Sequence, residues 1–386
     1  MNHPDTRRLV VILNNEIMPY RIPLFNALAD DPELRLQLLF STHRGWDRQW
    51  SLDRKNLKAP HRVMPGVAFR LRKPDYGEFR TVYVNPTLLW HLMRLRPQAV
   101  VGYEYSVPAM TAMMYSQVSG CAYVVWTEGT SLTERNLTRG QLWTRRMIIP
   151  RAQAYLGTSL AACANLLARG AQPERVYEAP QSHAIRWFEQ AAENARKSRP
   201  ADEEKVILYV GFLNERKGVD RLLQAFARVA GNLPGSRLVL VGEGPLRERL
   251  VDLTSELGIR PRVEFRGFVQ PTEMPEVYAS ADVFVLPSRE DTFGVVVVEA
   301  LASGVPVICS TDAGVSSHLV NEDSALLIDP DNVELLAEQM TRLLTEPGLR
   351  MRLVAEGRRV ARAFEATAVA LPFKTAVLAA LEAKSA

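Results

Sequence analysis

Two carboxylates, Asp291 and Glu299, stand eight positions apart in a segment that we expect to become helical. Asp291 and Thr292 are favoured N-cap residues, so the N–H groups of the first helical turn, near Phe293 and Gly294, would point outward. Such N–H groups attract negative charge. Eight residues correspond to about two helical turns, which is too far for a close catalytic pair. The spacing therefore predicts an anion site at a helix start, with a second carboxylate farther along the helix.

The elements around these carboxylates form a β-α-β unit. Residues 282–287 are an apolar run closed by proline and serine, which suits a buried parallel strand. The valines at 295–298 favour strand by propensity, but the residues from Glu299 to the stop at Gly304 favour helix, and we predict a buried helix. A second strand follows at 305–310. The helix start then faces the carboxyl ends of the strands, where α/β sheets bind ligands.

A basic loop precedes another expected helix. It runs from Gly211 to Gly218, ahead of a helix predicted at 219–229, and it carries Arg216 and Lys217. A lysine in this place can pair as a point charge with a diphosphate above the helix N-terminus. We therefore predict that Lys217 binds phosphate, and that Arg216 does so if the loop turns it inward.

These segments resemble the donor-binding half of retaining glycosyltransferase family 4, among the glycosyl transferases group 1, whose members have the GT-B fold. The family signature is E-x7-E, here Asp291 to Glu299, and its basic loop reads G-R-L before K-G, here with Phe212 in place of the arginine. The resemblance implies that Asp291 binds sugar hydroxyls, Lys217 the phosphates and Glu299 the ribose hydroxyls. The residues assigned in this way to the donor are Gly211, Phe212, Arg216, Lys217, Gly242, Gly267, Phe268, Val269, Asp291, Phe293, Gly294, Val295 and Glu299.

Two glycine-containing segments complete the expected donor site. Gly242-Glu-Gly-Pro follows a predicted strand and precedes a predicted helix at 246–257, as in the family, where this loop lies near the nucleotide. Arg266-Gly-Phe-Val resembles the segment whose backbone frames the base. We expect Gly242 near the nucleotide and residues 267–269 against the base, with a core position as the alternative for Phe268.

The first half of the chain matches the family less closely. Tyr20 and Arg21 lie after the first predicted strand, where many members carry a glycine pair. Glu128 occupies a place where members commonly have a histidine beside the transferred sugar. A carboxylate there could hold a sugar hydroxyl or stabilise an oxocarbenium-like centre. We predict acceptor contacts for Tyr20 and Arg21, and catalytic roles for Glu128, Asp291 and Lys217.

The resemblance also implies a mechanism, in which the sugar is transferred with retention of its anomeric configuration. An oxygen of the departing diphosphate helps to deprotonate the acceptor, while Lys217 and helix-terminal N–H groups offset the developing charge. The six histidines are scattered without metal-ligand spacing. We expect a UDP- or GDP-sugar as donor substrate, no cofactor and no metal.

Alternating strands and helices predict an α/β fold throughout the chain. The alternation is that of a doubly wound sheet, and it restarts after a polar, charged stretch at 186–204 that reads as an interdomain connection. We predict a GT-B protein with two Rossmann-like domains facing a central cleft. The expected parts are an acceptor-binding domain at 1–185, a nucleotide-sugar-binding domain at 186–365 and a C-terminal helix at 366–386 that, by resemblance, crosses back to the first domain.

Charge is distributed unevenly between the two halves. Residues 1–185 carry a formal net charge of +9, and the remainder carries −5. Such asymmetry predicts an anionic acceptor or an anionic membrane surface as the partner of the first domain, and nucleic acid is disfavoured because no recognition motif is present. Basic residues at 41–96 alternate with aromatic ones, which predicts peripheral membrane contact or, equally, a solvated face. The side chains concerned are Trp46, Trp50, Phe69, Tyr76 and Phe79, followed by Arg135, Arg139, Arg145, Arg146 and Arg151.

The remaining composition bears on location. No uninterrupted apolar run approaches the roughly 20 residues that span a bilayer, and the N-terminus does not read as an export signal. The three cysteines, Cys121, Cys163 and Cys309, are far apart and odd in number. We expect a cytoplasmic protein, peripheral on the cytoplasmic membrane face if the basic segment contacts lipid.

Three functions compete on these observations. The leading hypothesis is a glycosyltransferase that extends a glycan or a lipid-linked acceptor in cell-surface polysaccharide or glycolipid biosynthesis. A GT-B nucleotide-sugar epimerase is an alternative, disfavoured by the lack of histidines near the expected site. A non-catalytic nucleotide-sugar-binding protein is the other, favoured by the departures at Phe212, Glu128 and Asp291.

Overall fold

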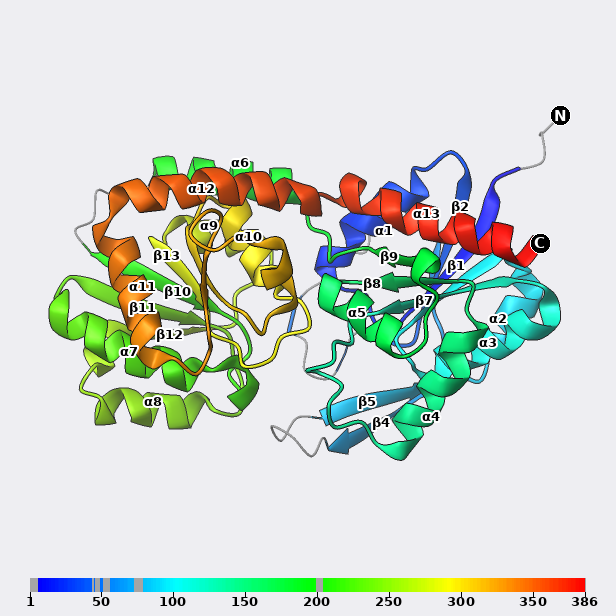
Figure 1. Cartoon of the computed structure of the whole chain (residues 1–386), viewed down its shortest axis with the longest axis horizontal. Coiled ribbons are helices and arrows are strands. Elements are labelled where there is room, and N and C mark those ends of the chain that lie inside the picture. Colours follow the sequence, from blue (N-terminus) through cyan, green and yellow to red (C-terminus); the bar gives the residue numbers. More distant parts are fainter. Residues whose placement is uncertain are drawn as a thin grey trace. The chain divides into compact units, whose positions relative to one another are not determined.

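The computed structural model describes residues 6–43, 45, 49–50, 56–72, 79–198 and 204–385. The chain divides into two compact units, Met1–Ser182 with Ala366–Ala386 (unit 1) and His183–Glu365 (unit 2). In each unit, helices cover both faces of a parallel sheet (Figure 1). Each sheet therefore separates two apolar clusters, as in a doubly wound α/β fold.

Unit 1 is built on a seven-stranded sheet of order β3-β2-β1-β6-β7-β8-β9, with all neighbours parallel. The order reverses between β1 and β6, and ligands bind α/β sheets at the carboxyl ends beside such a reversal. The strands are β1 (Arg8–Asn14), β2 (Leu34–Phe40), β3 (His61–Val63), β6 (Ala99–Tyr103), β7 (Ala122–Thr127), β8 (Ala154–Gly157) and β9 (Val176–Glu178). A separate antiparallel hairpin consists of β4 (Val67–Arg72) and β5 (Phe79–Val84).

The helices of unit 1 include the C-terminal helix of the chain. They are α1 (Ile22–Ala29), α2 (Leu88–Leu95), α3 (Val107–Ser119), α4 (Arg139–Ile148), α5 (Leu160–Ala168) and α13 (Ala366–Ser385). Phe373 of α13 meets Trp126 of β7 edge to face, with ring centroids 5.3 Å apart. By length and composition alone α13 could cross a membrane, but one of its faces is buried in the core of unit 1.

Unit 2 repeats the architecture with a six-stranded parallel sheet of order β12-β11-β10-β13-β14-β15. Here the reversal falls between β10 and β13. The strands are β10 (Lys205–Val210), β11 (Ser236–Val241), β12 (Val263–Gly267), β13 (Val283–Leu286), β14 (Val307–Ser310) and β15 (Leu326–Ile328). The helices are α6 (Ile185–Lys197), α7 (Val219–Asn232), α8 (Arg247–Glu256), α9 (Met274–Ala279), α10 (Val295–Ala302), α11 (Val333–Thr345) and α12 (Pro347–Ala361).

The polar stretch that the sequence presents as a connection is largely the helix α6 of unit 2. Ile185, Phe188 and Ala192 are buried along one face of α6, and the first two join an apolar cluster of unit 2. The charged residues occupy the other face, which is why the segment reads as a linker. The prediction of a connection at 186–204 is therefore wrong for the part that forms α6, and the division between the units falls between Ser182 and His183.

Candidate functional site

Lys217 and Asp291 meet at the carboxyl ends of β10 and β13, where the strand order of unit 2 reverses. The Nζ atom of Lys217 lies 2.5 Å from Oδ2 of Asp291. Lys217 ends a short 3₁₀ turn, and Gly218 takes the chain into α7 with a φ of 65°. A Cβ atom on Gly218 would lie 2.2 Å from the carbonyl oxygen of Pro287, so glycine permits this loop to approach the end of β13.

The charge of Asp291 is held in place by two cations. Burial alone would raise the pKa of Asp291, but Lys217 and Arg216 together hold it below its ordinary value. Nη1 of Arg216 donates to the carbonyl oxygen of Glu290 over 2.8 Å, so the loop does turn this arginine toward the Asp291 segment. Phe212, in the place of the family's arginine, has 41% of its surface exposed. Arg216 thus supplies the positive charge that Phe212 lacks.

The start of α10 differs from the prediction. Gly294, with a φ of 96°, is the N-cap residue, so the N-cap roles predicted for Asp291 and Thr292 are wrong. The carboxylate of Asp291 forms its backbone hydrogen bond within the loop that precedes α10, where Oδ1 accepts from the N–H of Phe293 over 3.3 Å. The ring of Phe293 is buried in the unit 2 core, and Val295 is partly buried against that core. The Phe293 N–H is therefore already bonded to Asp291, contrary to the expectation that it points outward.

Glu299, one helical turn inside α10, is held through both of its carboxylate oxygens. The hydroxyl of Tyr278 donates to Oε2 over 2.7 Å, and Nε2 of His183 lies 2.8 Å from Oε1. The side chain of Glu299 remains 14% exposed. Sequence reasoning missed Tyr278 and His183, because neither belongs to a motif and the two are brought to Glu299 only by the fold.

The predicted glycine loops gather at the same edge of the sheet. The N–H of Gly211 donates to Val241 over 2.9 Å, and the N–H of Gly242 donates to Gly267 over 2.8 Å. A Cβ atom on Gly242, whose φ is 133°, would lie 1.9 Å from the carbonyl oxygen of Gly211. Phe268 is half-buried, and Val269 packs against the core. Backbone hydrogen bonds thus join the loops that follow β10, β11 and β12. The Lys217–Asp291 ion pair is a separate contact, between the loops that follow β10 and β13.

Arg21 and Glu128 form the corresponding polar cluster of unit 1. Arg21 is completely buried, and its guanidinium pairs with Oε1 of Glu128 and donates to the Tyr103 hydroxyl over 2.9 Å. The same Oε1 atom accepts from the Tyr103 hydroxyl over 2.7 Å and from the Gln181 amide. Arg21 also lies over the rings of Tyr103 and Trp126, with 4.2 and 4.6 Å to the centroids. The prediction that Arg21 contacts the acceptor is therefore wrong in this structure, where Arg21 positions Glu128.

Tyr20 and Glu128 remain accessible at this cluster. Tyr20 is half-buried, and its ring centroid lies 5.6 Å from the Arg21 guanidinium carbon. The side chain of Glu128 is 17% exposed. Its carboxylate is thus fixed by several donors and still reaches the surface, as a group that binds a substrate hydroxyl should.

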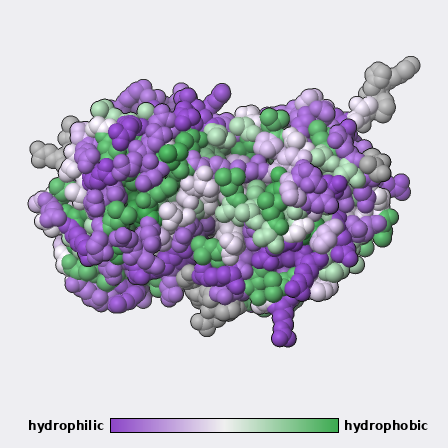
Figure 2. All heavy atoms as spheres, in the orientation of Figure 1, coloured by the Kyte–Doolittle hydropathy of each residue, from purple (hydrophilic) through white to green (hydrophobic). Residues whose placement is uncertain are grey.

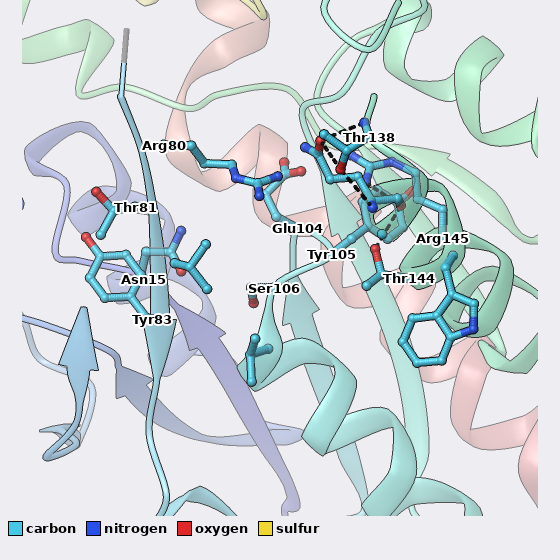
Figure 3. Close-up of a pocket in the computed structure, with 15 residues that line it drawn as sticks. Asn15, Arg80, Thr81, Tyr83, Glu104, Tyr105, Ser106, Thr138, Thr144 and Arg145 are labelled. Atoms are coloured by element: carbon cyan, nitrogen blue, oxygen red, sulfur yellow. Dashed lines mark hydrogen bonds between the residues drawn. The ribbon is translucent and has the colours of Figure 1, made fainter. Parts of the chain in front are cut away.

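A pocket of about 510 Å³ opens in unit 1 next to this cluster, between β5, the start of α3 and α4 (Figure 3). Arg80 and Glu104 project into it from β5 and from the end of β6, and Trp143 of α4 lines it with 57% of its surface exposed. Such a volume suits a small ligand. Sequence reasoning missed this pocket, because its walls come from segments far apart in the chain.

Glu104 links the pocket to Glu128. Its Oε1 atom accepts from the N–H of Glu128 over 2.7 Å, and its Oε2 atom accepts from Oγ1 of Thr127 over 3.1 Å. The backbone of Glu104 is left-handed, with a φ of 56°, which is strained for a residue other than glycine. Burial, followed by the charge of Glu128, raises the pKa of Glu104 to about 7.

Arg145 lies in the wall of the pocket, and so on neither the membrane-facing patch nor the solvated face that the sequence offered as alternatives. Its Nε atom donates to Oε1 of Glu134 over 2.8 Å, and its guanidinium carbon lies 4.3 Å from the Tyr105 ring centroid. Arg145 is buried, so it does not belong to a membrane-facing surface. Of the aromatic residues in that predicted surface, Phe69 and Phe79 are exposed, whereas Trp46 and Tyr76 lie outside the described residues.

Two basic side chains supply positive charge at the unit 2 site, Lys217 and Arg216. Within the described ranges no three histidine, cysteine, aspartate or glutamate side chains group so as to hold a metal ion.

Comparison with known proteins places unit 2 in a family. The model of the family described as glycosyl transferases group 1 matches residues 190–360. The chain is 34% identical over 204 residues to D-inositol 3-phosphate glycosyltransferase of Rhodococcus jostii. This alignment covers 50% of the present chain and 45% of that protein. It is 32% identical over 170 residues to the GDP-mannose-dependent alpha-(1-6)-phosphatidylinositol monomannoside mannosyltransferase of Mycobacterium tuberculosis, covering 42% and 44%. The similarity thus spans less than half the length of these curated relatives.

Solved structures extend the likeness of fold to both units. Anabaena HepE in complex with UDP has a TM-score of 0.76 at 16% identity, covering 96% of this chain and 98% of that one. Sucrose-phosphate synthase from Thermosynechococcus elongatus has a TM-score of 0.73 at 20% identity, with the same coverage. The fold is therefore GT-B, with a Rossmann-like sheet in each unit. Residues 190–360, which carry Lys217, Asp291 and Glu299, belong to the glycosyl transferases group 1 family.

Proposed function

We propose that the chain is a retaining glycosyltransferase that moves a sugar from a nucleotide-sugar donor to a glycan or lipid-linked acceptor. The observation that carries the proposal is the buried Lys217–Asp291 pair at the β10/β13 reversal. Lys217 is held there by its own loop and by Asp291, ready to bind the diphosphate of a donor. Asp291 is kept ionised by Lys217 and Arg216, and an ionised carboxylate accepts hydrogen bonds from sugar hydroxyls.

The proposed mechanism needs charge stabilisation but no protein nucleophile. As the bond between the anomeric carbon and the phosphate oxygen breaks, negative charge grows on the departing diphosphate. Lys217 and Arg216 offset that charge, in a transfer that we propose to be independent of metal. An oxygen of the departing diphosphate takes the proton of the acceptor hydroxyl, which attacks the same face of the sugar and thereby retains its configuration.

Glu299 is proposed to recognise the nucleotide. Its carboxylate already accepts from Tyr278 and lies beside His183, and each carboxylate oxygen has a second lone pair for a ribose hydroxyl. HepE was solved with UDP, and the mycobacterial relative is named as GDP-mannose-dependent. These names support a UDP- or GDP-sugar as the donor, with the residues at 267–269 against the base.

The pocket of unit 1 is proposed to bind the acceptor. Trp143 offers an exposed ring on which a sugar can stack, and Arg80 supplies a positive charge to the pocket. Glu104 of the pocket lining offers a carboxylate for hydroxyls, and it accepts from the backbone N–H of Glu128. The relatives named for inositol phosphate and for phosphatidylinositol mannoside support a glycan or glycolipid product, which we place in cell-surface polysaccharide or glycolipid biosynthesis.

A cytoplasmic location with peripheral membrane contact is also part of the proposal. Phe69 and Phe79 of the β4–β5 hairpin are 54% and 55% exposed, and the guanidinium carbon of Arg70 lies 4.5 Å from the Phe79 ring centroid. Arginine beside interfacial aromatics suits an anionic headgroup region. On the face drawn in Figure 2, hydrophilic and hydrophobic side chains are interspersed over each unit.

The proposal is tested by following donor consumption. Wild type would be incubated with UDP- and GDP-sugars, with and without candidate acceptors, and the released nucleotide and the anomeric configuration of the product would be measured. An alpha-linked donor should give an alpha-linked product. Nucleotide binding without release or transfer would instead favour the non-catalytic alternative, and conversion of the donor into an epimer would favour the epimerase.

A further inference from the structure

A second cavity of unit 1, about 160 Å³ in volume, lies between the strands β2 and β3 and the helix α2. The residues that give it chemical character are Arg62 of β3 with His91 and Arg94 of α2, and Gln37 of β2 contributes an amide. No acidic side chain is among the described residues that line it. The cavity is thus polar, positively charged and separate from the sites discussed above.

His91 is the least exposed polar residue that lines this cavity. It is 7% exposed, and its ring makes no hydrogen bond to any residue that the structure describes. Its ring meets Trp90 edge to face, with centroids 4.8 Å apart. The ring nitrogens of His91 are not among the fully buried, unbonded side-chain atoms of the described residues, so they remain reachable from the cavity. A ligand in the cavity can therefore accept a hydrogen bond from His91.

The charges around His91 define that ligand. Burial, followed by Arg62 and Arg94, lowers the pKa of His91, so the imidazole sits in a positive field that no carboxylate of the cavity neutralises. An anion between the two guanidinium groups would neutralise the field and accept from all three side chains. The planar guanidinium group of arginine presents paired N–H donors, which match the oxygens of a phosphate in geometry as well as in charge.

We propose that Arg62, His91 and Arg94 form a binding site for a phosphate group. The volume decides the size of the ligand, because sites for whole small molecules measure about 300–1,000 Å³ and this cavity is about half the lower limit. It therefore holds the phosphate itself, either as inorganic phosphate or as the phosphodiester of a lipid headgroup. Leu89, Trp90 and Met93, exposed on α2 by 43%, 48% and 52%, would lie against acyl chains in the second case.

The first experiment follows the His91 ring by NMR in the whole protein, across a pH series with and without inorganic phosphate. Phosphate should raise the pKa of His91 in a saturable manner. The double variant Arg62→Gln/Arg94→Gln should weaken phosphate binding by about tenfold or more, since it removes both cationic hydrogen-bond donors of the cavity. Arg96→Gln, which removes one charge at the end of α2 but none from the cavity lining, is the matched control and should bind as wild type does.

A second experiment distinguishes a lipid headgroup from free inorganic phosphate as the ligand. Co-sedimentation of the protein would be measured with vesicles of phosphatidylcholine alone and with vesicles that also contain phosphatidylglycerol. Binding that the double variant loses and Arg96→Gln keeps assigns the site to a lipid headgroup, whereas a phosphate response without vesicle binding assigns it to free phosphate. If phosphate leaves His91 unchanged and vesicle binding is equal in all three proteins, the site does not exist. Because all the variants lie outside the donor and acceptor residues, this outcome would leave the proposed transferase function standing.

Discussion

The ammonium group of Lys217 and the carboxylate of Asp291 form an ion pair of 2.5 Å, and their side chains are only 13% and 10% exposed. The two residues are 74 positions apart, and they meet because β10 and β13 are neighbours at the reversal of the unit 2 sheet. A buried ion pair at that place does two things. It keeps a cation where a donor diphosphate would bind, and it makes the stability of unit 2 depend on both partners.

Removal of Lys217 alone should be costly. Lys217→Met leaves Asp291 buried without its main cation, and the free energy of unfolding should fall by about 3–5 kcal/mol. Lys217→Met/Asp291→Leu should recover most of that loss while remaining inactive with any donor. Urea denaturation measures both, and Lys58→Met, which breaks an exposed pair with Asp30, should change stability by less than about 1 kcal/mol. A double variant no more stable than Lys217→Met would contradict the assignment.

The same pair predicts a dependence of stability on acid. Since the pKa of Asp291 is lowered in the folded state, its ionised form stabilises the protein above the unfolded value of about 3.9, and this contribution is lost as pH falls through the folded pKa. In Lys217→Met the pKa of Asp291 should rise, so the loss should begin at a higher pH. Thermal unfolding between pH 3 and 7 checks this, and parallel acid profiles of the two proteins would refute it.

Variants of Glu299 and Tyr278 should affect different properties, with nucleotide binding weakened by the first and stability lowered by the second. Glu299→Gln keeps the size of the side chain but removes the charged acceptor, and it should weaken nucleotide binding by roughly tenfold or more. Tyr278→Phe removes only the buried hydroxyl that donates to Glu299, so it should cost about 1 kcal/mol of stability and leave nucleotide affinity within about threefold. Calorimetry with UDP and GDP gives the affinities. Equal weakening in both variants would mean that Glu299 acts through the Tyr278 contact and not on the ligand.

Arg21 should act on Glu128 and not on substrate. Arg21→Met leaves the Glu128 carboxylate without its buried cation, and we expect a loss of about 3–5 kcal/mol in stability together with a fall in kcat. Tyr103→Phe removes one neutral donor to the same oxygen and should cost only about 1 kcal/mol. Neither variant should change the affinity for free UDP or GDP, because the residues proposed to bind the nucleotide all belong to unit 2. Weaker binding of the free nucleotide would show that Arg21 contacts the donor.

The sequence predicts the elements that carry strong local patterns. The apolar runs that become β10, β13 and β14, and the glycines that turn the chain at Gly218 and Gly294, are visible in single segments. The position of Lys217 and Asp291 at one edge of the sheet follows from them, because parallel strands place their carboxyl ends together, but the ion pair between the two is not predicted. Phe293 shows the limit of this reasoning, because its N–H bonds to the carboxylate that the pattern presents as a helix cap.

What the sequence does not predict depends on contacts over long distances. Nothing local marks Tyr278 or His183 as partners of Glu299, or Arg80 and Glu104 as walls of one pocket. Arg21 looks like a ligand-binding residue in the sequence because it is charged. In the structure its buried guanidinium forms an ion pair with Glu128, because a buried charge needs a partner of opposite sign.

Glu104 gives the last prediction, which concerns neutral pH. Its pKa of about 7 in the folded state exceeds the unfolded value of about 4.5, so the unfolded chain releases this proton first as pH rises. The contribution of Glu104 to stability should therefore decline between about pH 4.5 and 7, by a total on the order of 3 kcal/mol. Glu104→Gln, which cannot ionise, should lose this part of the pH dependence, and urea denaturation at pH 5 and pH 8 measures the difference. A stability difference between the two pH values that is the same in both proteins would show that Glu104 is ionised throughout, held so by the donors from Thr127 and Glu128.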